Sequence, residues 1–273
     1  MKSGTYIKRP NRALQIYACV FLFVLYLPVL FIPLFSFNDS IYVRFPMQGL
    51  TTRWYVDLWS RDTVWAALGN SVTVGIWVSV ISTGLGVVAA RAITRYRIPG
   101  QSAILTFALL PLIVPGIIFG VALLVLLSRL GIPLSLYTVG LGHLIICLPF
   151  AIATLLPRFE GFERSLDEAS ADLGENGWWT FWRVTFPMVA PGILASLLLT
   201  FTISFDEFIM TFFLSGTDTT LPIYIWSQLR FPQQFPVVLA MSSVILALSF
   251  VMVFLALWIG RMGVAREYAD DPQ

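Results

Sequence analysis

Residues 168–187 read EASADLGENGWWTFWRVTFP, a polar and turn-rich stretch in a chain that is otherwise strongly hydrophobic. The 273 residues are 58% hydrophobic and only 12% charged, whereas this stretch crowds carboxylates, glycines and tryptophans between two long apolar runs. A composition so apolar excludes an ordinary soluble fold. The stretch is therefore an insert between hydrophobic segments, and its purpose depends on what those segments are.

The hydrophobic residues gather into runs long enough to cross a lipid bilayer. A helix needs about 20 apolar residues to span a hydrocarbon core roughly 30 Å thick. Backbone groups in lipid must find partners within their own element, so such runs form helices. The first run is too long for a signal peptide and is expected to stay in the protein. We expect an all-α membrane protein with six transmembrane helices, at residues 13–37, 66–90, 102–127, 136–157, 192–214 and 236–260.

The lysines and arginines predict the orientation of these helices. Cytoplasmic loops carry an excess of both residues. If the N-terminus is cytoplasmic, 12 of the 17 lysines and arginines fall in inside segments. Both termini are then cytoplasmic, and so is the quoted stretch, which lies in the longest inside loop, at about 158–190. The formal net charge of +2, with no separate basic patch, argues against a nucleic-acid partner.

The chain lacks the motifs of the common enzyme sites. Its only lysines are Lys2 and Lys8, so the G-x-x-x-x-G-K-[ST] phosphate loop of ATPases cannot occur. With a single histidine, His143, neither an H-E-x-x-H zinc motif nor a multi-histidine metal cage is available. We therefore expect no catalytic residue, no metal and no cofactor on this chain. His143 itself is either a hydrogen-bonded core histidine or a group that lines a solute path.

Small residues recur on one face of the second span. Gly75, Ser79 and Thr83 are spaced four residues apart, which places them on the same side of a helix. Small side chains allow two helix backbones to approach closely in lipid. We expect this face to pack against another helix rather than to bind a ligand.

Prolines interrupt the start of the third span, which reads LLPLIVPGIIFG. Pro111, Pro115 and Gly116 are expected to bend or break the helix there. Such breaks are tolerated at membrane depth where neighbours or a cavity satisfy the freed carbonyl groups. The break is either a simple kink or a part that moves during transport.

The fifth span carries two adjacent carboxylates, Asp206 and Glu207. An ionisable group at membrane depth is costly and usually faces a bundle interior or a watered cavity. Neighbouring side chains on a helix point about 100° apart, so the two cannot share a face. Either one of them contacts a solute, with Ser204 and His143 as further candidates, or both are structural. A further alternative is that the span ends early and leaves both carboxylates at the outer interface. A carboxylate in a solute path favours a cationic solute.

The quoted stretch has the local signals of two short helices joined by a turn. Ser165 and Glu168 fit a capping box at the start of a helix, and Asp167 is expected near that positive end or on the exposed face. Gly174 is a suitable left-handed stop, and an Asn-Gly dipeptide then makes a turn. The second short helix, WWTFWRVTF, is expected to end at Pro187. Its tryptophans suit the lipid interface or the pocket of a partner protein.

The same stretch resembles the EAA---G---------I-LP signature of the permease subunits of bacterial ABC importers. The spacing agrees at every step, while serine, valine and phenylalanine stand for the signature's third residue, isoleucine and leucine. The resemblance covers about residues 62–260, expected to form the permease domain, with a first helix and outer loop in 1–61 and a cytoplasmic tail in 261–273. The aligned residues are Glu168, Ala169, Ser170, Gly174, Val184, Phe186 and Pro187.

The resemblance implies a role for the loop. In such permeases the loop forms coupling helices that dock into a groove on a separate cytoplasmic ATPase, which binds ATP and Mg²⁺. By position, Glu168 would contribute charge and a cap, Ala169 a close approach, and Gly174 the turn between the helices. The implied partners are two ATPase copies, a second permease subunit of different sequence, a periplasmic solute-binding protein and the lipid of the bacterial inner membrane.

The fifth span and the loop after it are similar to those of the spermidine/putrescine permeases. That family commonly carries an acidic pair where this chain has Asp206 and Glu207. The resemblance therefore implies an organic polycation as the solute. Permeases for opines, amino-acid derivatives, ferric iron and thiamine share much of the pattern, so these solutes stay open. A passive channel, a secondary transporter and a scaffold subunit are the alternatives from other classes.

Overall fold

The computed structural model describes residues 12–96 and 99–267, with side chains described as far as residue 251. The described chain consists of helices and connecting turns, with one isolated bridge between Asn38 and Leu50. It divides into two compact units. One is Met1–Arg61 together with Gln228–Gln273, and the other is Asp62–Ser227.

Five helices in the described part of the chain are long and apolar enough to cross a membrane. They are α1 (Arg12–Ser36), α3 (Asp62–Arg95), α6 (Leu136–Glu160), the continuous run Gly177–Asp206 and the stretch Pro232–Val251. A sixth crossing results if the bent pair Gln101–Leu112 and Gly116–Arg129 counts as one span. The prediction of an all-α protein with membrane-spanning helices is confirmed, with five or six spans.

The first unit contains α1, α2 (Arg53–Trp59), the 3₁₀ turn η3 (Pro232–Gln234) and α12 (Phe235–Glu267). Within it, α12 packs against both α1 and α2. Large apolar side chains are exposed along α1, a pattern typical of a helix surrounded by lipid. The indole N–H of Trp54 donates to the backbone carbonyl of Asn38 at 2.9 Å, which ties α2 to the loop after α1.

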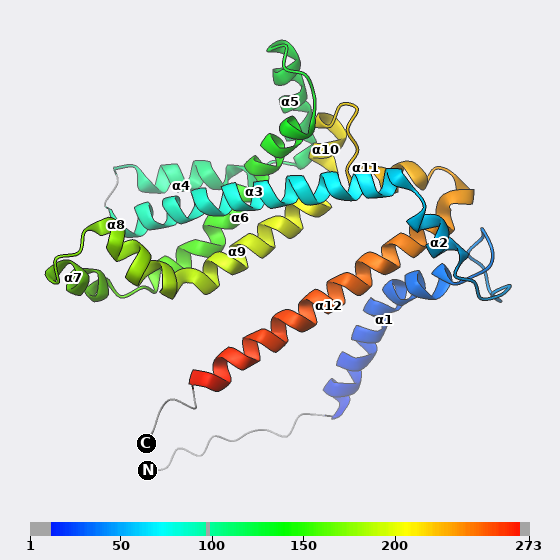
Figure 1. Ribbon diagram of the computed structural model, residues 1–273, viewed down its shortest axis with the longest axis horizontal. Coiled ribbons are helices and arrows are strands. Elements are labelled where there is room, and N and C mark those ends of the chain that lie inside the picture. The colour runs from blue at the N-terminus through cyan, green and yellow to red at the C-terminus, as the bar shows by residue number, and fades with distance from the viewer. Residues whose placement is uncertain (1–11, 97–98, 268–273) are drawn as a thin grey trace. The chain divides into compact units, whose positions relative to one another are not determined.

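Three long helices, α3, α6 and α9, form the core of the second unit and pack against one another. Two buried apolar clusters stabilise it, one around Val78, Val139 and Met210 and the other around Ala90 and Leu155. The remaining elements are α4 (Gln101–Leu109), η1 (Leu110–Leu112), α5 (Gly116–Arg129), α7 (Arg164–Asp172), α8 (Gly177–Thr180), η2 (Phe181–Thr185), α9 (Phe186–Asp206), α10 (Ile209–Leu214) and α11 (Leu221–Gln228). Figure 1 shows α7 and α8 at one end of this unit, with α5 and α10 toward the other.

The small-residue face of α3 packs against α9, as predicted. Gly75, Ser79 and Thr83 are all buried. A Cβ atom added to Gly75 would lie 2.9 Å from the ring of Phe201 on α9, so a larger residue there would require that ring to shift. The hydroxyl oxygen of Thr83 lies 3.1 Å from that of Ser196 on α9. Helix packing accounts for this face.

The third apolar run is broken where its prolines stand. α4 passes into η1 and stops, and α5 begins at Gly116, directly after Pro115. The two parts of the run are bent by 97°. Pro111 and Pro115 lack the backbone N–H that a continuing helix needs, which explains the break. The predicted interruption is confirmed.

The fifth apolar run starts earlier than expected and is not closed by Pro187. α8 continues through η2, a π-helical turn, directly into α9. The prediction of a second short helix that ends at Pro187 is therefore wrong. Proline is well tolerated in the first turn of a helix, and Pro187 stands in the first turn of α9. The backbone N–H of Phe186 donates to the carbonyl of Phe181, which is the wide π-type bond that carries the chain past this point.

The same run also ends earlier than expected. The sequence predicts one helix over 192–214, but α9 stops at Asp206 and α10 follows after a break. Glu207 has an extended backbone, with ψ of 112°. Its carboxylate accepts hydrogen bonds from the backbone N–H groups of Ile209 and Met210 at 2.9 and 3.2 Å. The single span is wrong because this carboxylate satisfies the donors that open a new helix.

The start of α7 also differs from the prediction. Glu163 occupies the N-cap position, and its side chain makes no capping bond. Ser165 lies inside the first turn and is exposed, so the predicted capping box of Ser165 and Glu168 does not form. The connection after α6 is short, and the Leu166 N–H donates to the backbone carbonyl of Glu163 at 3.2 Å, so the helix starts before Ser165 is reached.

Candidate functional site

The loop between α6 and α9 contains two short helices joined by a left-handed turn, here called the α7–α8 hairpin (residues 164–180). At the turn, Gly174 has a φ of 88°. The N–H groups of Gly174 and Glu175 donate to the carbonyls of Ala171 and Ser170 at 2.9 and 3.2 Å, the Schellman pattern of a helix end. Glycine adopts this φ without strain. The predicted stop at Gly174 is confirmed.

The second helix of the hairpin is capped and fastened to the first. The side-chain oxygen of Asn176 accepts from the backbone N–H groups of Trp178 and Trp179 at 3.1 and 3.0 Å, which caps α8. The hydroxyl oxygens of Ser170 and Thr180 lie 3.0 Å apart and are buried between the helices. The hairpin is therefore one connected body rather than a loose loop.

Polar contacts attach the hairpin to two of the three long helices, α3 and α9. The buried carboxylate of Asp167 lies 3.0 Å from the guanidinium of Arg95, in the last turn of α3. Its other oxygen accepts from the Thr185 hydroxyl at 3.1 Å, just before α9. Arg164 donates to the backbone carbonyl of Thr94 at 2.7 Å. Asp167 lies in the first turn of α7, near its positive end as expected, and its side chain faces the core rather than solvent.

The opposite face of the hairpin is open. Glu168 and Ala169 are exposed there, and Leu173 has 86% of its surface uncovered. Apolar and aromatic side chains with charged neighbours are typical of a protein interface. The exposed tryptophans of the same segment are Trp178, Trp179 and Trp182.

The signature residues therefore divide into two groups. Glu168, Ala169 and Gly174 are exposed, where a partner can reach them, and so is Pro187 at the start of α9. Ser170 is buried, and its hydroxyl is engaged with Thr180. Ser170 thus holds the hairpin together from inside.

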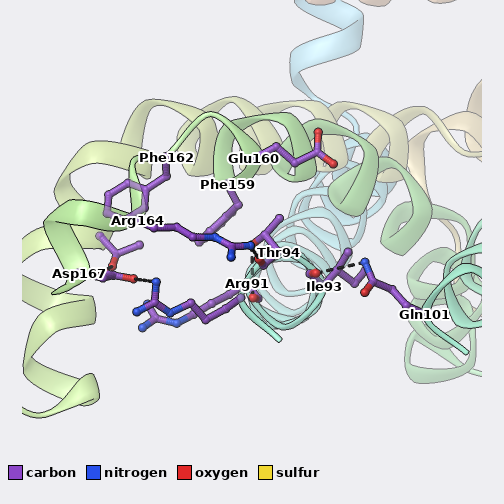
Figure 2. Close-up of a pocket in the computed structure, with 11 residues that line it drawn as sticks. Arg91, Ile93, Thr94, Gln101, Phe159, Glu160, Phe162, Arg164 and Asp167 are labelled. Atoms are coloured by element: carbon purple, nitrogen blue, oxygen red, sulfur yellow. Dashed lines mark hydrogen bonds and ion pairs between the residues drawn. The ribbon is translucent and has the colours of Figure 1, made fainter. Parts of the chain in front are cut away.

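A pocket of about 280 Å³ lies beside the hairpin, between α3, α4, α6 and α7 (Figure 2). Its walls carry arginines and carboxylates together with uncharged side chains. The lining residues are Arg91, Ile93, Thr94, Arg95, Gln101, Phe159, Glu160, Phe162, Arg164, Asp167 and Thr185.

The break between α9 and α10 separates the two adjacent carboxylates. Glu207 is partly buried and is used as the cap of α10. Asp206 is exposed, and its carboxylate has no hydrogen-bond or ion-pair partner in the part of the chain that the structure describes. Of the two, Asp206 is the one whose charge is free to meet a solute or another subunit.

His143 connects the two sides of this break. It is only 1% exposed. Its Nδ1 atom lies 2.8 Å from the Ser204 hydroxyl on α9, and its Nε2 atom lies 3.1 Å from the Thr211 hydroxyl on α10. Thr211 in turn donates to the backbone carbonyl of Glu207 at 2.9 Å. The structure brings buried His143 and Ser204 together with the backbone of Glu207 in one hydrogen-bonded cluster, in agreement with a core histidine.

The sequence profile of the family described as "Binding-protein-dependent transport system inner membrane component" matches residues 82–262. The chain belongs to this family. It is 32% identical over 240 residues to the spermidine/putrescine transport system permease protein PotC of Escherichia coli (strain K12), covering 87% of this chain and 89% of that protein. It is also 32% identical over 240 residues to the putrescine transport system permease protein PotI of the same strain, covering 85% of each chain.

The fold of this permease is also similar to that of a protein of known structure. A chain in the crystal structure of a bacterial ABC transporter involved in the import of the acidic polysaccharide alginate superposes with a TM-score of 0.68 at 17% identity. The match covers 93% of this chain and 98% of that one. The permease therefore shares its fold with an ABC transporter subunit. As a permease subunit of an ABC importer, it works with a separate ATPase and a solute-binding protein.

The structure shows residues that attach the hairpin and that the sequence did not single out. Arg95 forms an ion pair with Asp167, and Thr185 on a different helix donates a hydrogen bond to it. The available sequence signal was the spacing of Asp167 and Ser170, which places both on one helical face. Charged or hydroxyl side chains on the inner face of a short helix need partners, and that need could have pointed to Asp167 as an attachment residue.

Proposed function

We propose that the chain forms half of the solute pathway of an ATP-driven polyamine importer in a bacterial inner membrane. Residues 62–260 are its permease domain, with a first helix and outer loop in 1–61 and a tail in 261–273. The observation that carries the proposal is the α7–α8 hairpin, in which Glu168 and Ala169 are open to a partner while Asp167 is held by the core.

The hairpin lies on the cytoplasmic side, as do both termini. The distribution of lysine and arginine supports this orientation. It brings the hairpin to the compartment that holds ATP, where two copies of the ATPase subunit bind ATP and Mg²⁺. A second permease subunit of different sequence supplies the other half of the pathway, and a periplasmic binding protein delivers the solute to it.

The hairpin transmits movement because it is joined to the core at several points. An ATPase that pulls on the exposed face displaces a body already held by the Ser170–Thr180 contact. The displacement reaches α3 through Arg95 and α9 through Thr185. Closing and opening of the ATPase dimer therefore shifts two of the three long helices together, which changes access to the pathway.

Asp206 supports a polyamine as the solute. A carboxylate at membrane depth is costly unless it faces a watered cavity or finds a partner, and Asp206 is exposed in the subunit. An ammonium group in the pathway would provide that partner. The name of PotC includes spermidine and putrescine, and that of PotI includes putrescine. Glu207, Ser204 and His143 support the pathway by fixing the break beside Asp206.

The proposal is tested by transport in proteoliposomes that contain the complete complex with its ATPase, second permease and binding protein. Labelled spermidine and putrescine are offered with and without internal ATP, and ATP hydrolysis is recorded in parallel. Amino acids, thiamine and ferric iron serve as unlabelled competitors. We expect uptake that requires ATP and that only polyamines inhibit.

The alternative outcomes are distinct. ATP-dependent uptake of a different solute would keep the importer and reject the polyamine. Uptake that persists without ATP would reject the coupled importer in favour of a channel or a secondary transporter. A complex that never moves any of the solutes and does not stimulate its ATPase would favour a scaffold subunit.

A further inference from the structure

The pocket beside the α7–α8 hairpin holds more positive than negative charge. Arg91, Arg95 and Arg164 line it together with Asp167 and Glu160. Asp167 is already engaged by Arg95. Figure 2 shows the Glu160 carboxylate directed away from Arg91 and Arg164. These two arginines thus have no carboxylate partner within the described residues.

Arg91 is the more unusual of the two. Its Nη1 atom is buried and donates to no acceptor in the described part of the chain. The guanidinium lies over the ring of Phe181, 4.6 Å from its centroid, which holds the plane of the group in place. A buried, charged N–H without an acceptor is unfavourable, and such groups normally have a partner. An anion in the pocket would supply the acceptor that this N–H group needs.

The position of the pocket along the helices is informative. The spans α3 and α6 end at Arg95 and Glu160, and both of these residues line the pocket. The pocket therefore lies at the ends of these two helices, where charged residues follow their apolar stretches. Basic pockets between the ends of transmembrane helices are suited to anionic groups such as lipid phosphates.

We propose that this pocket binds a phosphate group, held by Arg91 from α3 and Arg164 from α7. The planar guanidinium matches phosphate oxygens and donates two hydrogen bonds at once. The phosphate belongs either to the headgroup of an anionic phospholipid or to a free phosphate ion. Because Arg91 and Arg164 lie on different elements, the bound group links α3 to the hairpin beside the Asp167–Arg95 ion pair. The site does not depend on which solute the permease carries.

The test measures binding to the purified complete complex after removal of its native lipid. One arm titrates phosphatidylglycerol against phosphatidylcholine and counts retained lipid by native mass spectrometry. The other arm titrates inorganic phosphate and follows it by isothermal calorimetry. Arg91→Gln and Arg164→Gln are compared with Arg183→Gln. Arg183 is exposed, lies in the same segment between α6 and α9 and does not line the pocket. Each pocket variant should bind the phosphate-bearing ligand about tenfold more weakly than the wild type, whereas Arg183→Gln should bind it as the wild type does.

Each arm identifies one source of the phosphate. If the pocket variants lose phosphatidylglycerol but not phosphate, the ligand is a lipid headgroup. If they lose phosphate but not phosphatidylglycerol, the ligand is a free phosphate ion. Equal binding by the wild type and by Arg91→Gln, Arg164→Gln and Arg183→Gln, or no binding in either arm, overturns the proposal. If Arg91→Gln does not assemble, Arg91→Lys keeps the charge without the planar fork and should still bind more weakly than the wild type.

Discussion

Asp167 and Arg95 form an ion pair, with Oδ2 and Nη1 3.0 Å apart, although one lies in the α7–α8 hairpin and the other in the last turn of α3. The second oxygen of Asp167 accepts from the Thr185 hydroxyl at 3.1 Å, directly before α9. A single buried carboxylate thus joins the hairpin to two long helices. A force applied to the hairpin must move those helices or break this pair.

Asp167→Asn should weaken the attachment without unfolding the hairpin. Asparagine can still accept from Thr185, but Arg95 loses its counter-charge. Because Arg95 is 33% exposed, we expect a loss of about 2 kcal/mol rather than the larger loss of a fully buried pair. Thermal unfolding of the purified complex measures the loss, and the ratio of solute uptake to ATP hydrolysis should fall.

The exposed Asp172 in the same helix provides the control, since Asp172→Asn removes the same charge without touching Arg95. Reversing the pair with Asp167→Arg and Arg95→Asp should restore part of the coupling that either single change removes. Equal uptake-to-hydrolysis ratios in Asp167→Asn, Asp172→Asn and wild type would show that the ion pair does not carry the coupling.

Glu168→Lys should leave the permease folded but disturb its contact with the ATPase. Glu168 is exposed and has no hydrogen-bond or ion-pair partner among the described residues, so reversing its charge costs the subunit little, within about 0.5 kcal/mol. Stimulation of ATP hydrolysis by the loaded binding protein should fall several-fold. The same reversal at exposed Glu163, at the edge of the hairpin, is the comparison. Normal stimulation in Glu168→Lys would remove this residue from the interface.

Asp206 and Glu207 should respond differently to loss of charge. Asp206→Asn removes an exposed carboxylate, and we expect the polyamine concentration for half-maximal uptake to rise on the order of tenfold. Glu207→Gln keeps an oxygen that can accept from Ile209 and Met210, so uptake should change little. Glu207→Ala loses the cap of α10 and should cost about 1 kcal/mol. Dose–response curves of uptake separate these cases, and an Asp206→Asn curve that overlies the wild type would leave Asp206 outside the pathway.

His143→Ala should destabilise the break between α9 and α10. It leaves a cavity and removes the partner of both the Ser204 and the Thr211 hydroxyls, so we expect a loss of about 3 kcal/mol. Tyr137→Ala on the same helix, where the side chain is 80% exposed, is the matched control. The unfolding temperatures of the two purified variant complexes are compared, and we expect the larger decrease for His143→Ala. An equal effect of both changes would mean that His143 is not part of a stabilising cluster.

The features that could be predicted from the sequence depend on local chemistry. Apolar length marks the spans, prolines mark the break before Gly116, and a glycine marks the end of α7. Where two local rules compete, prediction failed. Pro187 is compatible both with a helix end and with a helix start, and the second applies here.

The remaining features depend on contacts between distant residues. Neither Asp167 nor Arg95 reveals its partner in the sequence, because the two lie 72 positions apart and meet only in the folded chain. The roles of Asp206 and Glu207 were likewise open, since an acidic pair does not show which member caps a helix. His143 could be recognised as a core residue only through its two hydroxyl partners.

Gly174→Ala should strain the turn of the hairpin through the backbone alone. The φ of 88° is unfavourable for alanine, at a cost of roughly 1–2 kcal/mol. An added Cβ atom meets nothing within 4 Å, so no steric clash contributes. Gly177→Ala is the matched control, because it also meets nothing within 4 Å and its φ is not positive.

Gly174→Asn should be milder than Gly174→Ala, since asparagine tolerates the left-handed region better. We expect Gly177→Ala to have the highest unfolding temperature and the highest coupled uptake of the three variants. Gly174→Asn should be intermediate, and Gly174→Ala should have the lowest values. If Gly177→Ala is as damaging as Gly174→Ala, the left-handed turn is not what orients the exposed face toward the ATPase.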